Sequence, residues 1–271
     1  MTSGLLRILH EDEDLLVLNK PAGLVCHPAK RGLESSLSGR VRLYLGLDQP
    51  VHLINRLDRE TSGVVVAAKS IEAARRLRKI WASREVEKEY WAVVHGHVER
   101  DQLTLEGPLG ADENSPVAVK DCVRADGAEA RTEAEVIRRF EREEGAFTWL
   151  QVRPHTGRKH QIRIHLAHEG HPIVGDKLYG ADEQAYLDLS GSTFFAEQWR
   201  PRLLLPYQAL HAGSVTFAWG GGRFEACGEP EPWLMPFVDG APLPALTELW
   251  DELESTSKPQ LAIEPDATNP Q

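Results

Sequence analysis

The residues best placed to do chemistry stand together in "INRLDRETSG", residues 54–63, directly before the apolar run "VVVAA". A carboxylate such as Asp58, set between arginines at the head of a rigid strand, can act as a nucleophile, a general base or half of a salt bridge. Thr61 and Ser62 can bond the backbone of the turn, and Gly63 allows chain or ligand to approach closely. Taken alone, these residues favour a structural Arg–Asp pair that braces the turn and leave a catalytic role open.

A second group of reactive side chains fills "RPHTGRKHQIRIHLAHEGHPIVGDKLYG", residues 153–180. His165 and His168 could share a helix face as metal ligands, but the segment has no His-Glu-x-x-His motif. It could instead bind RNA phosphate, with Gly157 making the turn, or form a basic, solvent-exposed helix. Its histidines and cations are His155, His160, His165, His168, His171, Arg153, Arg158, Lys159 and Arg163.

Tyr90 stands in "KEYWAVVHG", an alternating segment that predicts a strand over residues 87–98. A tyrosine in a strand most often packs in the core. It can also offer a flat surface on which a nucleobase stacks. The residues around Tyr90 favour the core interpretation and leave the second one open.

Charge is distributed unevenly along the chain. The net charge of the 271 residues is −10, but residues 228–271 carry nine acids and one lysine, which leaves only −2 for the rest. Residues 74–84 and 153–165 contain no acid at all. Because local patches decide whether phosphate can be held, an acidic total does not exclude a nucleic-acid partner.

The elements that must position these residues are mainly strands. Turns and apolar runs predict two strands between residues 7 and 20, a buried strand at 63–69 and mostly β-structure over 103–152. Another strand is expected within 207–221. Ser70 should cap a helix that leaves Arg75, Arg76 and Lys79 outward and whose inward face carries Ile71, Ala74, Leu77, Arg78 and Trp81. Further helices are expected over 34–45, 158–170, where Gly170 ends the helix, and 245–256. The sum is a mixed domain with many antiparallel strands and few helices.

Several protein classes are excluded by simple patterns. No stretch of eighteen apolar residues is present, so no transmembrane helix is expected, and the N-terminus lacks a signal-peptide pattern. We therefore expect a cytoplasmic protein. Cys26, Cys122 and Cys227 lie too far apart for a Cys-x-x-Cys site and are expected to be idle thiols.

Three separated segments together resemble the successive motifs of the RluA-type RNA pseudouridine synthases. They are "EDEDLLVLNKPAGLVCHP", "NRLDRETSG" and "TGRKHQIRIHLAHEGHPIVGDKLYG". "EKEYWAVVHG" and "QALHAGSVTF" follow in the family's order, so the resemblance covers about residues 8–219. It implies an α+β fold with a mixed, mainly antiparallel sheet in two halves, flanking helices and a central active-site cleft.

The resemblance also implies a role for individual residues. Asp58 matches the catalytic aspartate, and Arg56 the arginine that fills the space left by a flipped nucleotide. Tyr90 matches the active-site tyrosine, which is expected to stack on the base and to assist proton removal. Arg163 is expected to pair with Asp58, and Ile162 to pack under the base. Arg158, Lys159 and His160 are the further residues expected to bind the substrate.

The activity implied is isomerisation of uridine to pseudouridine in a tRNA or rRNA stem-loop, without metal or organic cofactor. We expect a monomer with a catalytic domain over 1–227 and an acidic, Pro-rich, partly disordered extension over 228–271. The chain starts at the first catalytic motif, without the family's small N-terminal RNA-binding domain, which favours tRNA and directs recognition to the catalytic domain and residues 181–206. Asn55 stands where the family commonly has histidine, so altered turn bracing or RNA contact is expected there.

Two other functions remain as alternatives. One is a non-catalytic RNA-binding protein on the same fold, although a protein that only binds has no use for the carboxylate of Asp58. The other is a metal hydrolase built on the histidines of residues 153–180.

Overall fold

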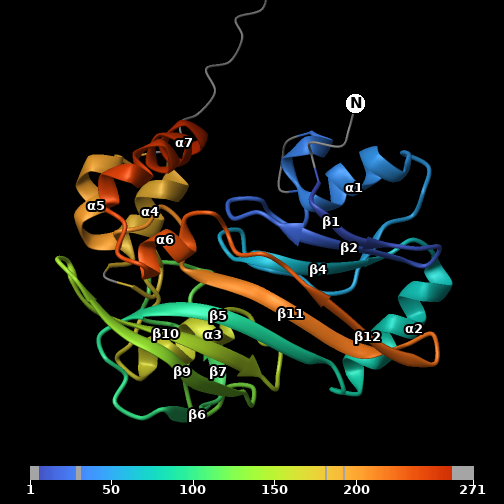
Figure 1. The fold of residues 1–271 in the computed structure, drawn as a ribbon, viewed down its shortest axis with the longest axis horizontal. Helices are drawn as coiled ribbons and strands as arrows, with labels where there is room; N and C mark the ends of the chain where they lie inside the picture. Colours follow the sequence, from blue (N-terminus) through green and yellow to red (C-terminus); the bar gives the residue numbers. More distant parts are fainter. Residues whose placement is uncertain (1–5, 29–31, 181, 192, 258–271) are drawn as a thin grey trace, which may run out of the picture.

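The computed structural model describes residues 6–28, 32–180, 182–191 and 193–257. Within them, ten strands form one sheet in the order β1-β2-β4-β11-β5-β10-β9-β6, with β3 paired to β4 and β12 to β11 (Figure 1). A two-stranded sheet of β7 and β8 lies apart. The bounds are β1 Ile8–Glu11, β2 Leu15–Lys20, β3 His52–Leu53, β4 Ser62–Ala68, β5 Glu87–His95, β6 Gln102–Glu106, β7 Leu109–Ala111, β8 Asp121–Val123, β9 Arg131–Arg142, β10 Gly145–Pro154, β11 Leu210–Trp219 and β12 Gly222–Cys227.

The sheet has a seam where β4 meets β11. These two strands are parallel and share only the pairs His211–Ser62 and Ala212–Gly63, whereas the other described strand pairs are antiparallel. Gly63 has a φ of +115°, and a Cβ there would lie 2.2 Å from the carbonyl oxygen of Ala212. Only glycine therefore allows this close approach. The mixed, mainly antiparallel sheet confirms the predicted α+β class.

The N-terminal half of the sheet is covered on both faces. Alternate residues of β2 and β4 pack against α1 (Leu37–Leu45) on one face and α2 (Ile71–Ala82) on the other. This two-sided cover explains why β2 and β4 are buried along their whole length. Ser36 and Ser70 cap the two helices, each accepting a hydrogen bond from a backbone N–H three residues on.

The predicted inward face of α2 was partly wrong. Ile71 is 47% exposed, and the buried residues of this helix are Ala73, Ala74 and Leu77. Ile71 is the first residue of the helix, where the chain has just left the sheet. Two small alanines allow the helix axis to lie close to β4, and this proximity replaces the contact that Ile71 was expected to make.

The second half of the sheet carries most of the remaining helices. Figure 1 shows α4, α5, α6 and α7 grouped above one end of it, with α3 against β10 and β9. The described residues after 228 belong to this group, since Trp233, Phe237 and Trp250 are buried in the largest core cluster. The bounds are η1 Leu33–Ser35, α3 Gln161–His168, α4 Gln184–Gly191, α5 Ala196–Leu203, α6 Leu234–Val238, η2 Leu243–Leu246 and α7 Thr247–Ser257.

Two predictions about the ends of the chain have different outcomes. The helix expected over 245–256 is confirmed by η2 and α7. The disorder expected from residue 258 onward lies outside the described residues, and the domain boundary at 228 stays a prediction. In the described ranges no helix has both the length and the apolar character needed to cross a membrane.

Candidate active site

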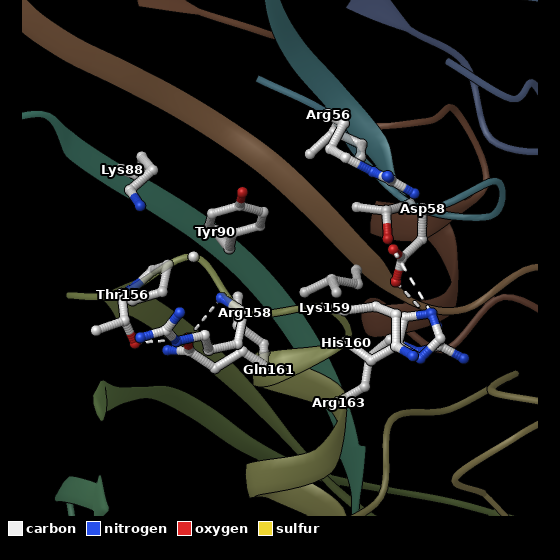
Figure 2. A pocket seen from close by; sticks show the side chains of 16 residues that line it. Arg56, Asp58, Lys88, Tyr90, Thr156, Arg158, Lys159, His160, Gln161 and Arg163 are labelled. Atoms are coloured by element: carbon white, nitrogen blue, oxygen red, sulfur yellow. Dashed lines mark hydrogen bonds and ion pairs between the residues drawn. The ribbon is translucent and has the colours of Figure 1, made fainter. Parts of the chain in front are cut away.

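A pocket of about 360 Å³ opens where β4, β5, β10, β11 and the start of α3 meet. It lies beside the seam, and Figure 2 shows its side chains converging from these elements. All eight residues predicted for catalysis or substrate binding line it: Arg56, Asp58, Tyr90, Arg158, Lys159, His160, Ile162 and Arg163. Segments that are more than a hundred residues apart in sequence therefore contribute to one site.

The turn that carries Asp58 is braced from behind. Leu57 is buried, and its backbone N–H and C=O both lie 3.4 Å from the sulfur of Cys26. The buried ammonium of Lys20 donates to three carbonyl oxygens at 2.8–3.1 Å, two in the turn after β2 and one at Arg59. These contacts fix the backbone on both sides of Asp58 and leave its carboxylate 25% exposed toward the pocket.

Asn55 braces the same turn against β4. Its side-chain amide donates to the carbonyl of Val64 at 3.1 Å and accepts from the N–H of Val66 at 2.8 Å. Asn55 therefore braces the turn, while the expectation that this bracing differs from that of a histidine stays a prediction. Thr61 and Ser62 were expected to bond the turn backbone, which is wrong: Thr61 accepts from the amide of Gln208, and Ser62 bonds the ring of His211 at 2.9 Å.

Arg163 joins two carboxylates at the centre of the site. Its Nη1 donates to Oδ2 of Asp58 at 2.9 Å, while Nε and Nη2 donate to the two oxygens of Asp176 at 2.7 and 2.8 Å. Burial opposes the charge of Arg163, but the charges and hydrogen bonds of the two aspartates outweigh it and raise the pKa of the guanidinium. The predicted pairing of Arg163 with Asp58 is present (Figure 2).

Asp176 anchors this arrangement from the interior. Burial would raise its pKa, yet Arg163 and the N–H groups of Leu178 and Tyr179 outweigh burial and lower the pKa. Since all its oxygens are occupied by these donors, Asp176 cannot react. It holds Arg163 in one orientation, and Arg163 in turn fixes one oxygen of Asp58 and leaves Oδ1 facing the pocket.

His160 approaches that free oxygen from the side. Its Nε2 lies 3.8 Å from Oδ1 of Asp58, and its Nδ1 lies 2.9 Å from the hydroxyl of Tyr179. Because the Tyr179 hydroxyl accepts from the N–H of Asp121, its own proton goes to Nδ1 and the ring proton is assigned to Nε2. Burial and the nearby charge of Arg163 lower the pKa of His160 to about 4, so the ring is neutral at pH 7.

Tyr90 and two aliphatic side chains form the apolar part of the pocket. Tyr90 projects from β5, and Ile162 and Leu210 line the same cavity from α3 and β11. Burial, with a smaller contribution from Asp58, raises the pKa of the phenol, so Tyr90 remains protonated at neutral pH. A flat ring next to a carboxylate and two aliphatic surfaces can receive a planar base.

Comparison with known proteins agrees with this geometry. The profile described as RNA pseudouridylate synthase matches residues 14–168, more than half of the chain. A protein of Pasteurella multocida, "Dual-specificity RNA pseudouridine synthase RluA", is 38% identical over 218 residues, covering 80% of this chain and 88% of its own. The chain belongs to the RluA-type RNA pseudouridine synthase family.

Two further comparisons bear on fold and length. The solved structure of "Human RNA Pseudouridylate Synthase Domain Containing 1" has a TM-score of 0.67 and 25% identity, covering 94% of this chain and 97% of its own. An "Uncharacterized RNA pseudouridine synthase" of Aquifex aeolicus is 39% identical over 183 residues, which are 65% of this chain and 56% of that protein. The chain thus spans little more than half the length of that curated relative.

The cations that line this pocket fall into two groups. Arg158 donates to the carbonyl of Glu129 at 3.1 Å, and Lys159 pairs with Asp121 at 3.0 Å. Arg56 and Lys88 line the pocket without a hydrogen bond or ion pair to any residue that the structure describes. Burial lowers the pKa of Lys88, which shows that its ammonium lacks a compensating anion.

The five histidines of residues 153–180 do not form a cluster. His155 pairs with Glu133, His165 bonds Thr132 and the carbonyl of Gly107, and His171 bonds the carbonyl of His95. Within the described ranges, no cluster of three or more histidine, cysteine or acidic residues could hold a metal ion. Only His160 of the five lines the catalytic pocket.

Four residues with clear roles in the site were missed from the sequence: Asp176, Tyr179, Gln161 and Lys88. Asp176 had a visible signal, because it and Glu169 are the only acids in the cationic segment 153–180. Lys88 also had one, because it stands two residues before Tyr90 on a strand and so faces the same side. Gln161, whose amide ties Thr156 and the N–H of Arg158 to β9, had no signal.

Proposed function

We propose that this protein isomerises uridine to pseudouridine in a stem-loop of tRNA or rRNA. One observation carries the proposal: Asp58 has one oxygen bound to Arg163 and the other open to a pocket that Tyr90, Ile162 and Leu210 line. A carboxylate fixed in this way beside a flat apolar slot suits chemistry on a nucleoside better than it suits a structural ion pair.

The reaction keeps every atom of the nucleotide. The glycosidic bond between sugar carbon and base nitrogen breaks, the uracil turns within the pocket, and a bond forms between the same sugar carbon and a base carbon. The proton on that base carbon is then released. Asp58 starts the sequence, either by attacking the sugar carbon or by removing a proton in an elimination route, and Arg163 stabilises its carboxylate throughout.

Removal of the last proton needs a base other than a tyrosinate. Because burial and Asp58 raise the pKa of Tyr90, its phenolate is not populated at neutral pH. In the proposal Tyr90 therefore supports the uracil by stacking and hydrogen bonding. Asp58 lines the same pocket, and its Oδ1, which accepts no hydrogen bond from the described residues, is the base that we propose.

The target base must leave its stack before it can react. Extrusion of a nucleotide costs a few kcal/mol. Arg56, which is exposed and has no partner among the described residues, is free to enter the gap that the base leaves. Phosphate contacts from Lys88 and the basic residues of the pocket rim would offset the remaining cost.

The substrate class is supported by the names of relatives. The Pasteurella protein is named for dual specificity, and a 38% identical protein of Xanthomonas campestris is named "Ribosomal large subunit pseudouridine synthase D". We keep tRNA as the first pool to test and rRNA as the second. A cytoplasmic monomer that needs no organic cofactor completes the proposal.

Tritium release tests the proposal directly. Uridine labelled at the base carbon that forms the new bond is incorporated into bulk tRNA and rRNA from cells lacking this gene, and each pool is assayed separately. Release from one pool identifies the substrate class. Asp58→Asn should lower the rate by at least about 10³-fold while RNA affinity stays within about twofold.

The alternative of an RNA-binding protein on the same fold makes a different prediction. It requires that neither pool releases tritium although both the wild-type protein and Asp58→Asn bind RNA. Full activity in Asp58→Asn would instead show that the assignment of the catalytic carboxylate is wrong.

A further inference from the structure

A second cavity of about 460 Å³ lies on the other side of the catalytic turn. It shares with the first pocket a wall made of Arg56, Leu57, Asp58, Lys159, His160 and Arg163. The hydrogen bond between Thr61, which lines the first cavity, and Gln208, which lines the second, continues this wall. The two cavities therefore adjoin at these residues, and we call the second one the α4 chamber.

The α4 chamber has the composition of a ligand site. Its volume lies within the range of roughly 300–1,000 Å³ common for small-molecule sites. Leu178 and Leu189 give it apolar walls, and Tyr186 on α4 adds an aromatic ring. The side chain of Tyr186 makes no hydrogen bond, ion pair or ring contact with the residues that the structure describes. A half-buried, unpartnered tyrosine at a cavity wall can stack on a base.

The chamber also offers cations suited to a phosphodiester. Arg59 uses only its Nε, which donates to the carbonyl of Gly23 at 3.2 Å, so its terminal N–H groups make no bond within the described residues. His27 is exposed on the same wall. Lys177, by contrast, is buried and donates to Glu60 and the carbonyl of Pro206. Free donors thus stand on the Arg59 side, next to the catalytic turn.

We infer that the α4 chamber binds the base of a nucleotide directly adjacent to the target uridine in the same RNA strand. This inference rests on the proposed function. Arg56 lies in the shared wall, so an RNA strand that passes over it can place the target uridine against Tyr90 and a neighbouring base against Tyr186. The phosphate between them then faces the unbonded guanidinium N–H groups of Arg59.

Such a subsite supplies recognition that the catalytic pocket cannot. The pocket at Tyr90 accepts the same uracil in every RNA, whereas a second base held on α4 depends on whether the neighbouring nucleotide can also unstack. Loop nucleotides unstack far more readily than paired ones. The α4 chamber would therefore select a uridine whose neighbour is also free to turn outward.

A double-mutant cycle between protein and RNA tests the inference. The substrate is a synthetic stem-loop that contains the uridine modified in the active pool, made intact and with an abasic nucleotide on either side of it. Rates and KM are measured for wild type, Tyr186→Ala and the ring-preserving control Tyr186→Phe. One flanking abasic nucleotide should lower kcat/KM of the wild type by about tenfold, and Tyr186→Ala should lower it equally on intact RNA.

The rate of Tyr186→Ala on the abasic RNA decides whether the inference holds. If the neighbouring base stacks on Tyr186, Tyr186→Ala and the abasic nucleotide together should cost no more than either alone, and Tyr186→Phe should behave as wild type. Losses that multiply to about a hundredfold, or a wild type indifferent to both abasic substitutions, would overturn the inference. Inhibition by free uridine monophosphate that is unaffected by either abasic nucleotide would also overturn it, in favour of a small-molecule site.

Two controls keep the inference testable. If Tyr186→Ala does not fold, Ser190→Trp fills the chamber from the exposed end of α4 and should produce the same coupling with the abasic nucleotide. A wild type that releases no tritium from any RNA shows instead that the proposed function has failed. In that case the stem-loop that the wild type binds most tightly is used instead, and its dissociation constants with and without abasic loop nucleotides, for wild type and Tyr186→Ala, test the chamber independently of the reaction.

Discussion

The centre of the site and its rim are built in opposite ways. At the centre, Arg163 donates hydrogen bonds to Asp58 and Asp176, and Asp176 also accepts hydrogen bonds from two backbone N–H groups. At the rim, Arg56 and Lys88 have no partner among the described residues. The groups proposed to act on bonds are held rigidly, while those proposed to meet RNA are left unpaired. The comparison shows that a charged side chain without partners can identify a functional residue as well as one whose hydrogen bonds are all made.

Removal of the anchor at the centre should have the largest effect. Asp176→Asn leaves the buried guanidinium of Arg163 with one carboxylate and releases Asp58 from its fixed orientation. We expect kcat to fall by at least about 100-fold and the free energy of unfolding by about 3 kcal/mol. Denaturant unfolding and single-turnover tritium release measure the two effects.

The control for this change is Asp126→Asn. Asp126 also pairs with an arginine, Arg124, but on an exposed hairpin outside both cavities. Asp126→Asn should leave activity unchanged and the free energy of unfolding within about 1 kcal/mol of the wild-type value. If Asp176→Asn were as mild as this control, the rigid centre would not matter for catalysis.

Arg56→Ala should come next, with a loss of about 10- to 100-fold in kcat/KM on a structured stem-loop. The reason is that nothing then fills the gap left by the flipped base, whose extrusion costs a few kcal/mol. On a short unstructured oligonucleotide the loss should shrink to a few fold, because there is little stacking to replace. An equal loss on both RNAs would mean that Arg56 only contributes charge.

Lys88→Met should have a smaller effect, about three- to tenfold in affinity for RNA. It keeps the aliphatic chain but removes the ammonium that lacks an anion in the free protein. The slope of log affinity against log salt should become shallower by about 0.7, as expected when one phosphate contact to a single strand is lost. Lys69→Met is the matched control, since Lys69 is already paired with Glu11. An unchanged salt dependence would show that Lys88 meets no phosphate.

The last prediction concerns the pH dependence of stability, not the rate of the reaction, and depends on His160. The folded protein holds its pKa at about 4, below the ordinary 6.5, so the unfolded chain binds a proton more readily between these values. Stability is therefore fully present above about pH 6.5 and falls as the pH is lowered toward 4, by up to roughly 2–3 kcal/mol.

His160→Gln should remove this part of the acid sensitivity. Burial also lowers the pKa values of His95, His165 and His211, but these residues are shared by both proteins and cancel in the comparison. Denaturant unfolding should therefore show that the free energy of unfolding falls more between pH 7 and pH 4.5 for wild type than for His160→Gln. Equal losses of unfolding free energy in the two proteins would show that protonation of His160 does not destabilise the folded state.

The motifs of the sequence were sufficient to predict the catalytic pocket but not what supports it. Asp58, Tyr90 and Arg163 stand in local patterns of charge and apolar residues that specify a turn, a strand and a helix. The link between Arg163 and Asp176 depends instead on how the chain returns after α3, which no local pattern encodes. The burial of Trp233, Phe237 and Trp250 in the core was not predicted, for another reason. Acids and prolines dominate the composition beyond residue 228 and conceal a few widely spaced aromatic residues that pack in the core.

β11 lies in the middle of the sheet, yet it comes from Leu210–Trp219, in the last quarter of the chain. During translation β2 and β4 can pair early, but the edge of β4 at Gly63 stays open until β11 has left the ribosome. Leu210 and Gln208, which line the two chambers, arrive at the same late moment. The proposed site is therefore incomplete until β11 has been added, so a chain interrupted before Leu210 should be unable to modify RNA.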